Sequence, residues 1–284
     1  MSACAYGICA VIQACNEEKS IQNVLSQVLR AKIEYCVVVA NGCADKTVEA
    51  VLHWPSNPNL SGKVISVDTA LGPDVSRGFG ALAALRSPWP VNWFVFLDGD
   101  WKGSFGPSLE DWLRRAVAAG NDVSYTIRPA ASSAFRRARR QDWHIWDQTL
   151  MKIGSPLKDP GIAQAPMVVS RKTFQRVSPF WLYQPGLWFA RCLTADPPLK
   201  IGVITGLGPS LVGNPTRSSN HQAKMLETLL GDAIEGSRIL LGFPKERLWQ
   251  GRERIGYHHL RRVDSLYEYM EHPALAFGVS VSHF

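Results

Sequence analysis

The sequence has no apolar run long enough to cross a membrane. Charged residues, Gly or Pro interrupt every hydrophobic stretch before the roughly 18 consecutive apolar residues that a membrane helix needs. The apolar stretch from Met1 to Ala14 also lacks a basic leading region and runs directly into Asn16, Glu17 and Glu18, which favours a strand over a signal peptide. We therefore predict a cytoplasmic protein.

Paired cysteines are also lacking. The six cysteines show no CxxC spacing, and several lie within apolar runs, where a thiol packs as a small hydrophobic side chain. We expect neither disulfides nor a zinc site. There is no internal repeat or low-complexity tract, and 284 residues with 46% hydrophobic content suffice for one large core.

The formal net charge of +7 favours anionic partners, but nucleic acid, a phospholipid surface and phosphorylated metabolites all fit that charge. A basic cluster at residues 136–140, followed by Trp143 and Trp146, suits a membrane interface or a nucleic-acid strand. A solvated segment followed by two core tryptophans explains the same pattern, and we favour it. Peripheral contact with a membrane stays open, whereas we expect no nucleic-acid partner.

What the first hundred residues do contain is an alternation of β-rich runs and helical periodicity. The pattern predicts strands at 8–14, 34–40, 63–67 and 93–97, with helices at about 21–29, from about 45, and at 78–85. This alternation predicts right-handed crossovers and an α/β fold with a mainly parallel central sheet flanked by helices. The ligand site should lie beyond the carboxyl ends of the strands.

After residue 108 the pattern is weaker. It predicts a helix to residue 119, strands at about 122–127 and 200–205, and a helix and strand within 154–176, around a poorly defined basic stretch. A long amphipathic helix follows from His221, and the last thirty or so residues are typical of short helices. We therefore place the main domain at residues 1–215 and a helical C-terminal extension at residues 216–284.

The strongest local signal is a predicted strand that ends in two carboxylates. Residues 94–97 are apolar, and Asp98-Gly99-Asp100 follows them directly in a loop that we expect to face solvent. Past a strand end, both acids can point into one crevice, where hard oxygen ligands hold Mg²⁺ or Mn²⁺ against a diphosphate. Because Asp and Gly also form simple turns, the position after a strand carries this interpretation.

Two further motifs follow the first two predicted strands. Residues 13–18, Gln-Ala-Cys-Asn-Glu-Glu, precede a helix that Asn16 can cap, and residues 41–47, Asn-Gly-Cys-Ala-Asp-Lys-Thr, follow the second strand. Alone, each is a helix cap or a turn. Together with Asp98-Gly99-Asp100, in that order and at those places, they resemble the motifs of family 2 glycosyltransferases with the GT-A (nucleotide-diphospho-sugar transferase) fold. The resemblance covers roughly residues 6 to 215.

The resemblance implies roles for individual residues. Asp100 would be the chief metal ligand, and the nucleoside, ribose and diphosphate would contact Gln13, Ala14, Asn16, Glu17, Asn41, Asp98 and Gly99. Arg77 can meet phosphate oxygens in fork geometry, although a surface arginine before a helix explains it equally well. Ala40 stands where many relatives have an Asp that reads the base, and Cys43 replaces the usual Ser, so uridine and guanosine both stay open.

Later segments resemble, more loosely, the glucosyl-3-phosphoglycerate synthase branch of these folds, at residues 156–161, 183–186 and 200–205. In that branch a His after the last sheet strand completes the metal site. The resemblance therefore implies His221 as a second metal ligand, with a solvent-exposed histidine at a helix start as the alternative. Arg217, in the same loop, would hold a phosphate.

Inverting members of the family have an acidic general base where this sequence reads Leu-Tyr-Gln-Pro at residues 182–185, without an acid. Either the enzyme retains configuration, or the base comes from elsewhere, with Asp159 and Asp147 as candidates. The sequence leaves the stereochemistry open.

The sequence thus predicts a metal-dependent glycosyltransferase that moves a hexose from a UDP- or GDP-sugar to a small-molecule or lipid-linked acceptor. A sugar-1-phosphate nucleotidyltransferase shares the sheet but should carry a Gly-rich phosphate loop, and residues 14–17 contain no glycine. A nucleotide-sugar-binding protein without turnover fits Ala40 and the missing acidic pair, whereas Asp98 and Asp100 argue against it. The oligomeric state stays open.

Overall fold

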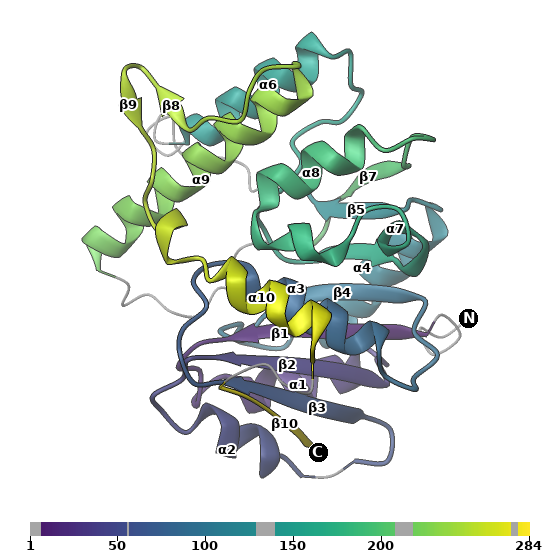
Figure 1. The fold of residues 1–284 in the computed structure, drawn as a ribbon. Helices are drawn as coiled ribbons and strands as arrows, with labels where there is room; N and C mark the ends of the chain where they lie inside the picture. Colours follow the sequence, from purple (N-terminus) through teal and green to yellow (C-terminus); the bar gives the residue numbers. More distant parts are fainter. Residues whose placement is uncertain (1–6, 56, 129–139, 208–217, 274–277) are drawn as a thin grey trace.

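A computed structural model describes residues 7–55, 57–128, 140–207, 218–273 and 278–284. Its centre is an eight-stranded sheet with the order β10-β3-β2-β1-β4-β6-β5-β7, flanked by helices (Figure 1). The strands are β1 (Ile8–Ala14), β2 (Tyr35–Asn41), β3 (Ser61–Val67), β4 (Trp93–Asp98), β5 (Val123–Thr126), β6 (Met167–Ser170), β7 (Ile201–Ile204) and β10 (Val279–His283). β1 to β4 run parallel, as predicted, while β6 is antiparallel to both β4 and β5.

Helices cover both faces of the parallel half of the sheet. They are α1 (Ile21–Arg30), α2 (Thr47–Leu52), α3 (Val75–Leu85) and α4 (Gly106–Ala118). Alternate residues of β1 point to opposite faces, so that Val11 packs in the core beside α3 and Ile12 packs in the core beside α1 and α4. A Cβ on Gly80 would lie 2.3 Å from the Val11 side chain, so this glycine lets α3 approach the sheet closely.

The second half of the main domain contains a helix that the sequence pattern left undefined. Its helical elements are α6 (Gln141–Lys152), α7 (Arg171–Phe174), the 3-10 helix η2 (Pro179–Tyr183) and α8 (Pro185–Leu193). The buried face of α6 includes the polar residues Asp142 and Thr149 beside Ile145, Trp146 and Leu150. Because these polar positions interrupt the apolar period, the helix gives only a weak sequence signal.

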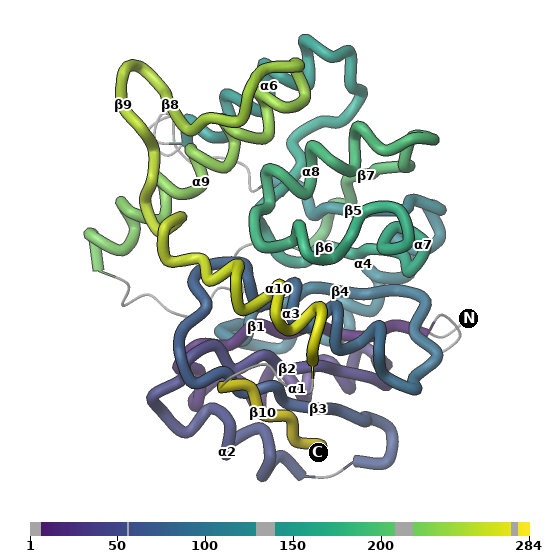
Figure 2. Tube along the Cα trace, in the orientation of Figure 1, coloured from purple at the N-terminus to yellow at the C-terminus, as the bar shows by residue number. Residues whose placement is uncertain are grey.

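The C-terminal residues return to the sheet. Beyond α9 (Ser219–Leu240) the chain forms β8 (Leu248–Trp249), β9 (Arg252–Glu253), the 3-10 helix η4 (His258–Leu260), α10 (Val263–Glu271) and then β10. Figure 2 follows this yellow segment from β9 past α10 to the edge of the sheet, where β10 pairs antiparallel with β3. The prediction of short helices is correct for α10 and wrong for β10, whose partner lies more than 200 residues earlier.

The remaining expectations about whole-chain properties concern cysteines and membrane helices. Cys9, Cys36, Cys43 and Cys192 are free thiols. Within the described residues, no helix has the length and apolar character that crossing a bilayer requires.

Candidate functional site

The loops that the sequence analysis singled out lie at one edge of the sheet. β3, β2, β1 and β4 are neighbours in that order and run parallel, so their carboxyl ends meet at the same edge. The register pairs Gln13 with both Val39 and Asp98, which places the three predicted loops side by side. A fourth loop, residues 68–74, enters the same edge between β3 and α3.

Hydrogen bonds join the loops that follow β1 and β2. The Asn16 side chain accepts a hydrogen bond from the Ala44 amide at 2.7 Å, and the Glu17 amide donates to Thr47 Oγ1 at 2.7 Å. Asn16 adopts a left-handed backbone conformation with φ 60°, and the N-cap position of α1 is Ser20. Our expectation that Asn16 caps this helix is therefore wrong, because its side chain connects the two loops instead.

Cys43, at the position where relatives carry Ser, takes part in the same connection. Its Sγ accepts a hydrogen bond from the Asn16 amide at 3.4 Å and donates to the Ala14 carbonyl oxygen at 3.6 Å. Burial raises the pKa of the Cys43 thiol, which keeps it protonated as this donor role requires.

Asn41 fixes the loop that follows β3. Its Oδ1 accepts a hydrogen bond from the Leu71 amide at 2.6 Å, and its Nδ2 donates to the Gly72 carbonyl oxygen at 3.3 Å. Both ends of the carboxamide are thus engaged by this loop. The role near a nucleotide base that the family resemblance implies stays a prediction.

The two carboxylates of the Asp98-Gly99-Asp100 motif lie at the end of β4 beside β1, with Asp98 as the last residue of the strand. Gln13 Nε2 donates to Asp98 Oδ1 at 2.5 Å, which fixes the orientation of that carboxylate. A Cβ on Gly99 would lie 3.0 Å from both the Ala14 Cβ and the Gln13 carbonyl oxygen, so glycine permits this close approach. We expected Asp100 to face solvent, and this prediction is wrong, since only 4% of the residue is exposed.

Arg77, at the start of α3, is not the surface arginine of our alternative interpretation. It is buried, and its Nη2 donates to the Ala163 carbonyl oxygen at 3.3 Å. Its Nη1 lies 3.6 Å from Asp74 Oδ1. The guanidinium therefore connects the loop before α3 to the segment that precedes β6, and contact with a phosphate stays a prediction.

The two candidate general bases share one arginine. Arg128 Nη2 donates to Asp159 Oδ1 at 2.7 Å and also to Asp147 Oδ1, although the Asp159 side chain is 62% exposed. The guanidinium of Arg128 lies over the Trp143 ring at 5.4 Å. Arg128 therefore forms a bridge between Asp147 on α6 and Asp159 in the loop before β6. The role of either carboxylate as a general base stays a prediction.

His221 lies in the first turn of α9. Its Nδ1 is 3.0 Å from the Tyr257 hydroxyl, and its amide donates to Ser218 Oγ at 3.2 Å. In Figure 1 the amino-terminal end of α9 lies on the side of the molecule where the parallel strands end. Arg217 lies outside the described residues, so its predicted phosphate contact has no structural account.

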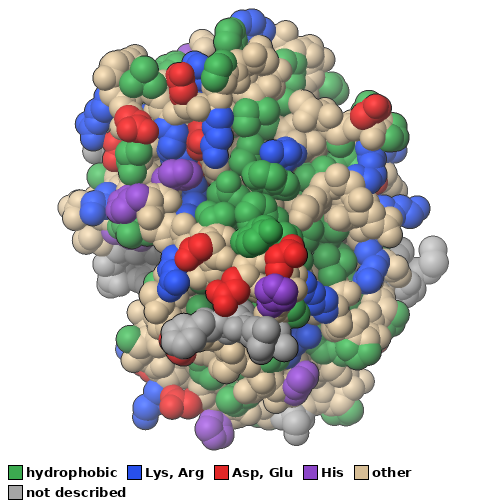
Figure 3. Space-filling model, in the orientation of Figure 1, with side chains coloured by type: hydrophobic (Ala, Val, Ile, Leu, Met, Phe, Trp, Pro, Cys, Tyr) green, Lys and Arg blue, Asp and Glu red, His purple; other side chains and the backbone are tan. Residues whose placement is uncertain are grey.

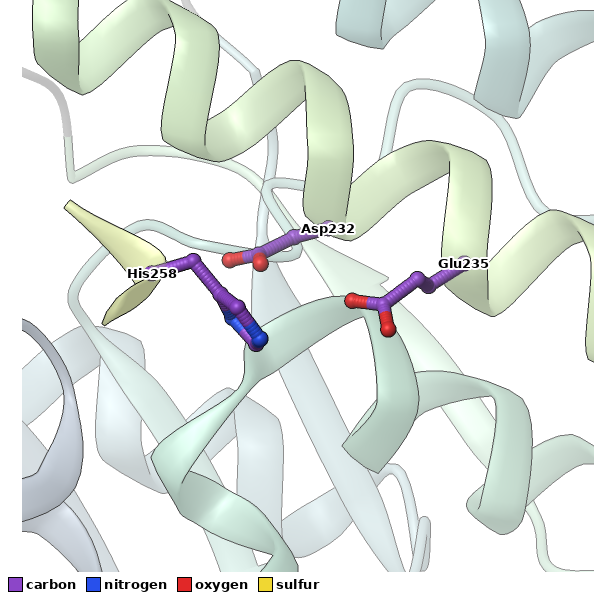
Figure 4. A group of neighbouring side chains, drawn as sticks. All are labelled: Asp232, Glu235 and His258. Carbon is purple, nitrogen blue, oxygen red and sulfur yellow. The ribbon is translucent and has the colours of Figure 1, made fainter. Parts of the chain in front are cut away.

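The sequence analysis missed a cluster of titratable groups in the C-terminal region. Asp232 and Glu235 project from α9 toward His258 (Figure 4), and their nearest ligand atoms all lie within 4.8 Å of one another. Among the described residues this is the group of three that could hold a metal ion, and it contains neither Asp100 nor His221. In the sequence, the cluster is indicated only by Asp232 and Glu235, two acidic residues on one helix with no motif around them.

Two buried arginines already occupy this cluster. Arg247 Nη1 donates to Asp232 Oδ1 at 2.9 Å and to Glu235 Oε2 at 2.5 Å. Arg261 donates to both carboxylate oxygens of Asp232, at 2.7 and 2.6 Å. His258 Nδ1 lies 3.3 Å from Arg247 Nη1 and 3.1 Å from Arg261 Nη1. Since the ligand atoms face two guanidinium groups, the cluster is a buried ion-pair network.

The network holds its members in fixed charge states. Burial raises the pKa of Asp232, but the Arg261 and Arg247 guanidinium groups outweigh it and hold that pKa below its usual value. Burial and the same two guanidinium groups lower the pKa of His258 from 6.5 to about 4. The imidazole is therefore neutral at pH 7 and accepts hydrogen bonds through Nδ1.

The depressed pKa of His258 predicts a loss of stability in mild acid. Between pH 6.5 and 4 the unfolded chain protonates this imidazole while the folded protein does not, so its contribution to the free energy of unfolding decreases as the pH falls. Urea denaturation at pH 7, 6 and 5 should show wild type losing stability relative to His258→Asn, whose carboxamide oxygen can accept the same hydrogen bonds. A difference that does not change with pH would contradict this assignment.

A small pocket of about 20 Å³ lies next to the network, between α6, the 160–164 loop and the facing sides of α8 and α9. Trp143 and Trp146 line it, together with Asp142 and Ala163. Trp146 is buried, as the core-tryptophan interpretation predicted, while Trp143 is half-buried with the Arg140 guanidinium 4.2 Å from its ring. Because Ala163 also binds Arg77, this pocket adjoins the strand-end edge.

The basic side chains show no single concentration on the face drawn in Figure 3. Lys and Arg are spread over it and interspersed with Asp and Glu, while hydrophobic side chains gather between α8 and α10. Residues 136–139 of the basic cluster lie outside the described residues.

Comparison with protein families identifies the chain. The sequence model of glycosyl transferase family 2 matches residues 9–178, which is more than half of the 284 residues. The chain belongs to this family. The matched region contains the four strand-end loops, with the Asp98-Gly99-Asp100 motif, and ends before His221. The roles of the individual site residues stay predictions.

Solved structures confirm the GT-A fold. A crystal structure of glucosyl-3-phosphoglycerate synthase from Mycobacterium tuberculosis in complex with phosphoglyceric acid has 15% identity and a TM-score of 0.58, over 86% of this chain and 82% of that chain. The same synthase in complex with Mn²⁺, uridine diphosphate and glucosyl-3-phosphoglycerate has 16% identity and a TM-score of 0.55, with the same coverage. No curated protein sequence matches the chain.

Proposed function

We propose that this family 2 glycosyltransferase transfers a hexose from a nucleoside-diphosphate sugar, with a divalent metal ion, to a small-molecule or lipid-linked acceptor. The observation that carries the proposal is the position of Asp98, the last residue of β4, and of Asp100 just beyond it, beside the loop of β1. This edge, past the carboxyl ends of parallel strands, is where α/β folds bind nucleotides.

The side chains at this edge fit a hard divalent cation. Two carboxylates, one of them buried, supply the oxygen ligands that Mg²⁺ and Mn²⁺ prefer, and an imidazole such as His221 suits Mn²⁺. When bound, the cation offsets negative charge on the leaving nucleoside diphosphate. Gln13 orients Asp98 by its hydrogen bond, which holds this carboxylate in place at the strand end that precedes Asp100.

The remaining residues would bind the donor. Asn16 and Glu17 hold the β1 loop against the β2 loop, which shapes the floor of a nucleoside site. Arg77 would reach a phosphate from the start of α3, and Arg217 would contribute a second cation. We favour uridine as the base and Mn²⁺ as the metal, because the structurally similar synthase carries both in its complex.

Asp159 would serve as a base only in an inverting reaction. With no acid among residues 182–185, retention of configuration is the alternative.

A thermal-shift panel of UDP, GDP and their hexose conjugates, each with and without Mn²⁺, tests the proposal. A ligand at a hundred times its Kd should stabilise the protein by about 2.7 kcal/mol. The absence of any shift at millimolar concentration with metal would refute nucleotide-sugar binding. Mn²⁺-dependent hydrolysis of the sugar nucleotide that binds then separates an enzyme from a binding protein without turnover.

A further inference from the structure

The C-terminal segment at residues 260–262 packs directly on the loop between β3 and α3. The Arg262 amide donates to the Leu71 carbonyl oxygen at 2.9 Å, and Arg261 Nε donates to the Pro73 carbonyl oxygen at 3.2 Å. Gly72 has φ +80°, and a Cβ there would lie 2.5 Å from the Leu260 carbonyl oxygen. The two backbones therefore approach so closely that only glycine fits between them.

The same loop is held from its other side by the strand-end edge. Asn41, the last residue of β2, bonds to Leu71 and Gly72, as described above. The loop thus lies between the proposed donor site and the C-terminal segment. Its position depends on contacts from both.

One side chain of the C-terminal segment connects this loop to α9. Arg261 Nη2 donates to Asp74 Oδ2 at 3.2 Å and to Asp232 Oδ2 at 2.6 Å, and its side chain is 1% exposed. Asp74 in turn lies 3.6 Å from the Arg77 guanidinium. Arg261 is therefore the first member of a series of ion pairs that reaches α3 at the donor side.

The backbone at Asp74 gives this ion pair particular weight. Asp74 has φ +67°, a left-handed conformation that costs free energy in a residue other than glycine. Burial raises the pKa of Asp74, whereas Arg77 and Arg261 act to lower it. The guanidinium groups therefore stabilise a buried carboxylate at a strained turn, and that turn sets where α3 begins.

We propose that Arg261 is a positioning residue for the sugar-nucleotide donor, and that it acts by fixing the Leu71–Asp74 loop and, through Asp74, Arg77. This inference rests on the proposed function of the strand-end edge. It gives the C-terminal region a part in donor binding although that region lies beyond the residues that match the family.

Replacing Arg261 with Lys tests the proposal, because one ammonium group cannot reproduce the paired bonds of a guanidinium. We expect the KM for the donor to rise about tenfold, a typical effect of losing a group that orients a ligand-binding residue, while kcat changes less than about twofold. Asp74→Asn should give the same change in KM. Asp98 and Asp100 are untouched in both variants.

Arg247→Lys is the matched control. Arg247 is also buried and also binds Asp232, but its other partners are Glu235, Thr228, Arg254 and His258, and none belongs to the 71–74 loop. Both Lys variants should lower Tm, and only Arg261→Lys should raise the donor KM. An equal rise in KM for the two variants, or a fall in Tm alone for Arg261→Lys, would overturn the proposal.

A readout without ligand separates this inference from the proposed function. Hydrogen exchange in the unliganded protein should be faster for the Leu71, Gly72 and Asp74 amides in Arg261→Lys than in wild type, and unchanged there in Arg247→Lys. Unchanged exchange at 71–74 in Arg261→Lys overturns the positioning role, whether or not wild type binds a nucleotide. The other outcome is faster exchange at 71–74 in Arg261→Lys combined with a wild type that binds no nucleoside diphosphate. That outcome would refute the proposed function and with it the role of Arg261 in donor binding.

Discussion

Replacing Asp100 with Asn should lower sugar-nucleotide turnover at least 10- to 100-fold and leave the protein folded. Loss of groups that only support a metal ligand typically costs about 10–100-fold, so loss of a ligand itself should cost no less. The carboxamide keeps the shape of the buried carboxylate but removes the negative charge that a cation requires. Turnover and nucleotide affinity, measured across a Mn²⁺ titration, check this prediction.

Asp111→Asn provides the control for the Asp100 variant. Asp111 lies on α4 and pairs with Arg114 and Arg115 on the protein surface, so the same chemical change there should leave Mn²⁺-dependent turnover unaltered. A turn-forming role for Asp100 predicts the opposite balance, with a small change in stability and undiminished metal dependence. That outcome would remove Asp100 from the metal site.

The parallel half of the fold was predictable because each element carries its own periodicity. β1 was predicted at residues 8–14 and occurs as Ile8–Ala14, and the strand that ends at Asp98 was predicted to within one residue. Their buried sides are continuous apolar runs followed by polar loops, which is what a parallel sheet covered on both faces requires. That order alone predicted that the loops after the strands lie at one edge of the sheet. The contact between Gln13 and Asp98 depends on the pairing of β1 with β4, which the structure shows.

The parts of the fold that the sequence did not predict depend on contacts between segments that are distant in the chain. β10 has half-exposed residues and little pattern of its own, and it becomes a strand by pairing with β3. Arg77 had two interpretations in sequence, a phosphate ligand or a surface side chain, and the structure shows a buried side chain bound to Ala163. The residues next to Arg77 in the chain do not indicate the contact with Ala163, which lies 86 residues later.

The network of Asp232, Glu235, Arg247 and Arg261 illustrates the same limit. Its members are spread over thirty residues without a motif, and their charges are those of an ordinary solvated helix and tail. Only the crossing of the tail over α9 brings them together. A Cβ on Gly231 would lie 2.1 Å from Arg247 Nη2, so this glycine lets the guanidinium lie directly on the helix.

Replacing Arg247 with Met should therefore destabilise the protein by about 3–5 kcal/mol, since removing one partner of a buried ion pair leaves the other charge without compensation. Among the described residues, Glu235 would keep Lys245 as its cationic partner, at 3.4 Å, and a half-exposed ammonium group compensates the carboxylate weakly. Urea denaturation of wild type and variant measures the free energy of unfolding directly.

Arg252→Met is the matched control. Arg252 also connects the C-terminal segment to α9, through an ion pair with Glu227 at 2.9 Å, but 69% of the arginine side chain is exposed. An exposed pair typically contributes about 0–1 kcal/mol, so this variant should stay close to wild type. Adding Glu235→Gln to Arg247→Met removes the uncompensated charge and should recover part of the loss. If the two arginine variants lose similar stability, or if the double variant recovers none, the cluster does not stabilise the C-terminal region through its buried charges.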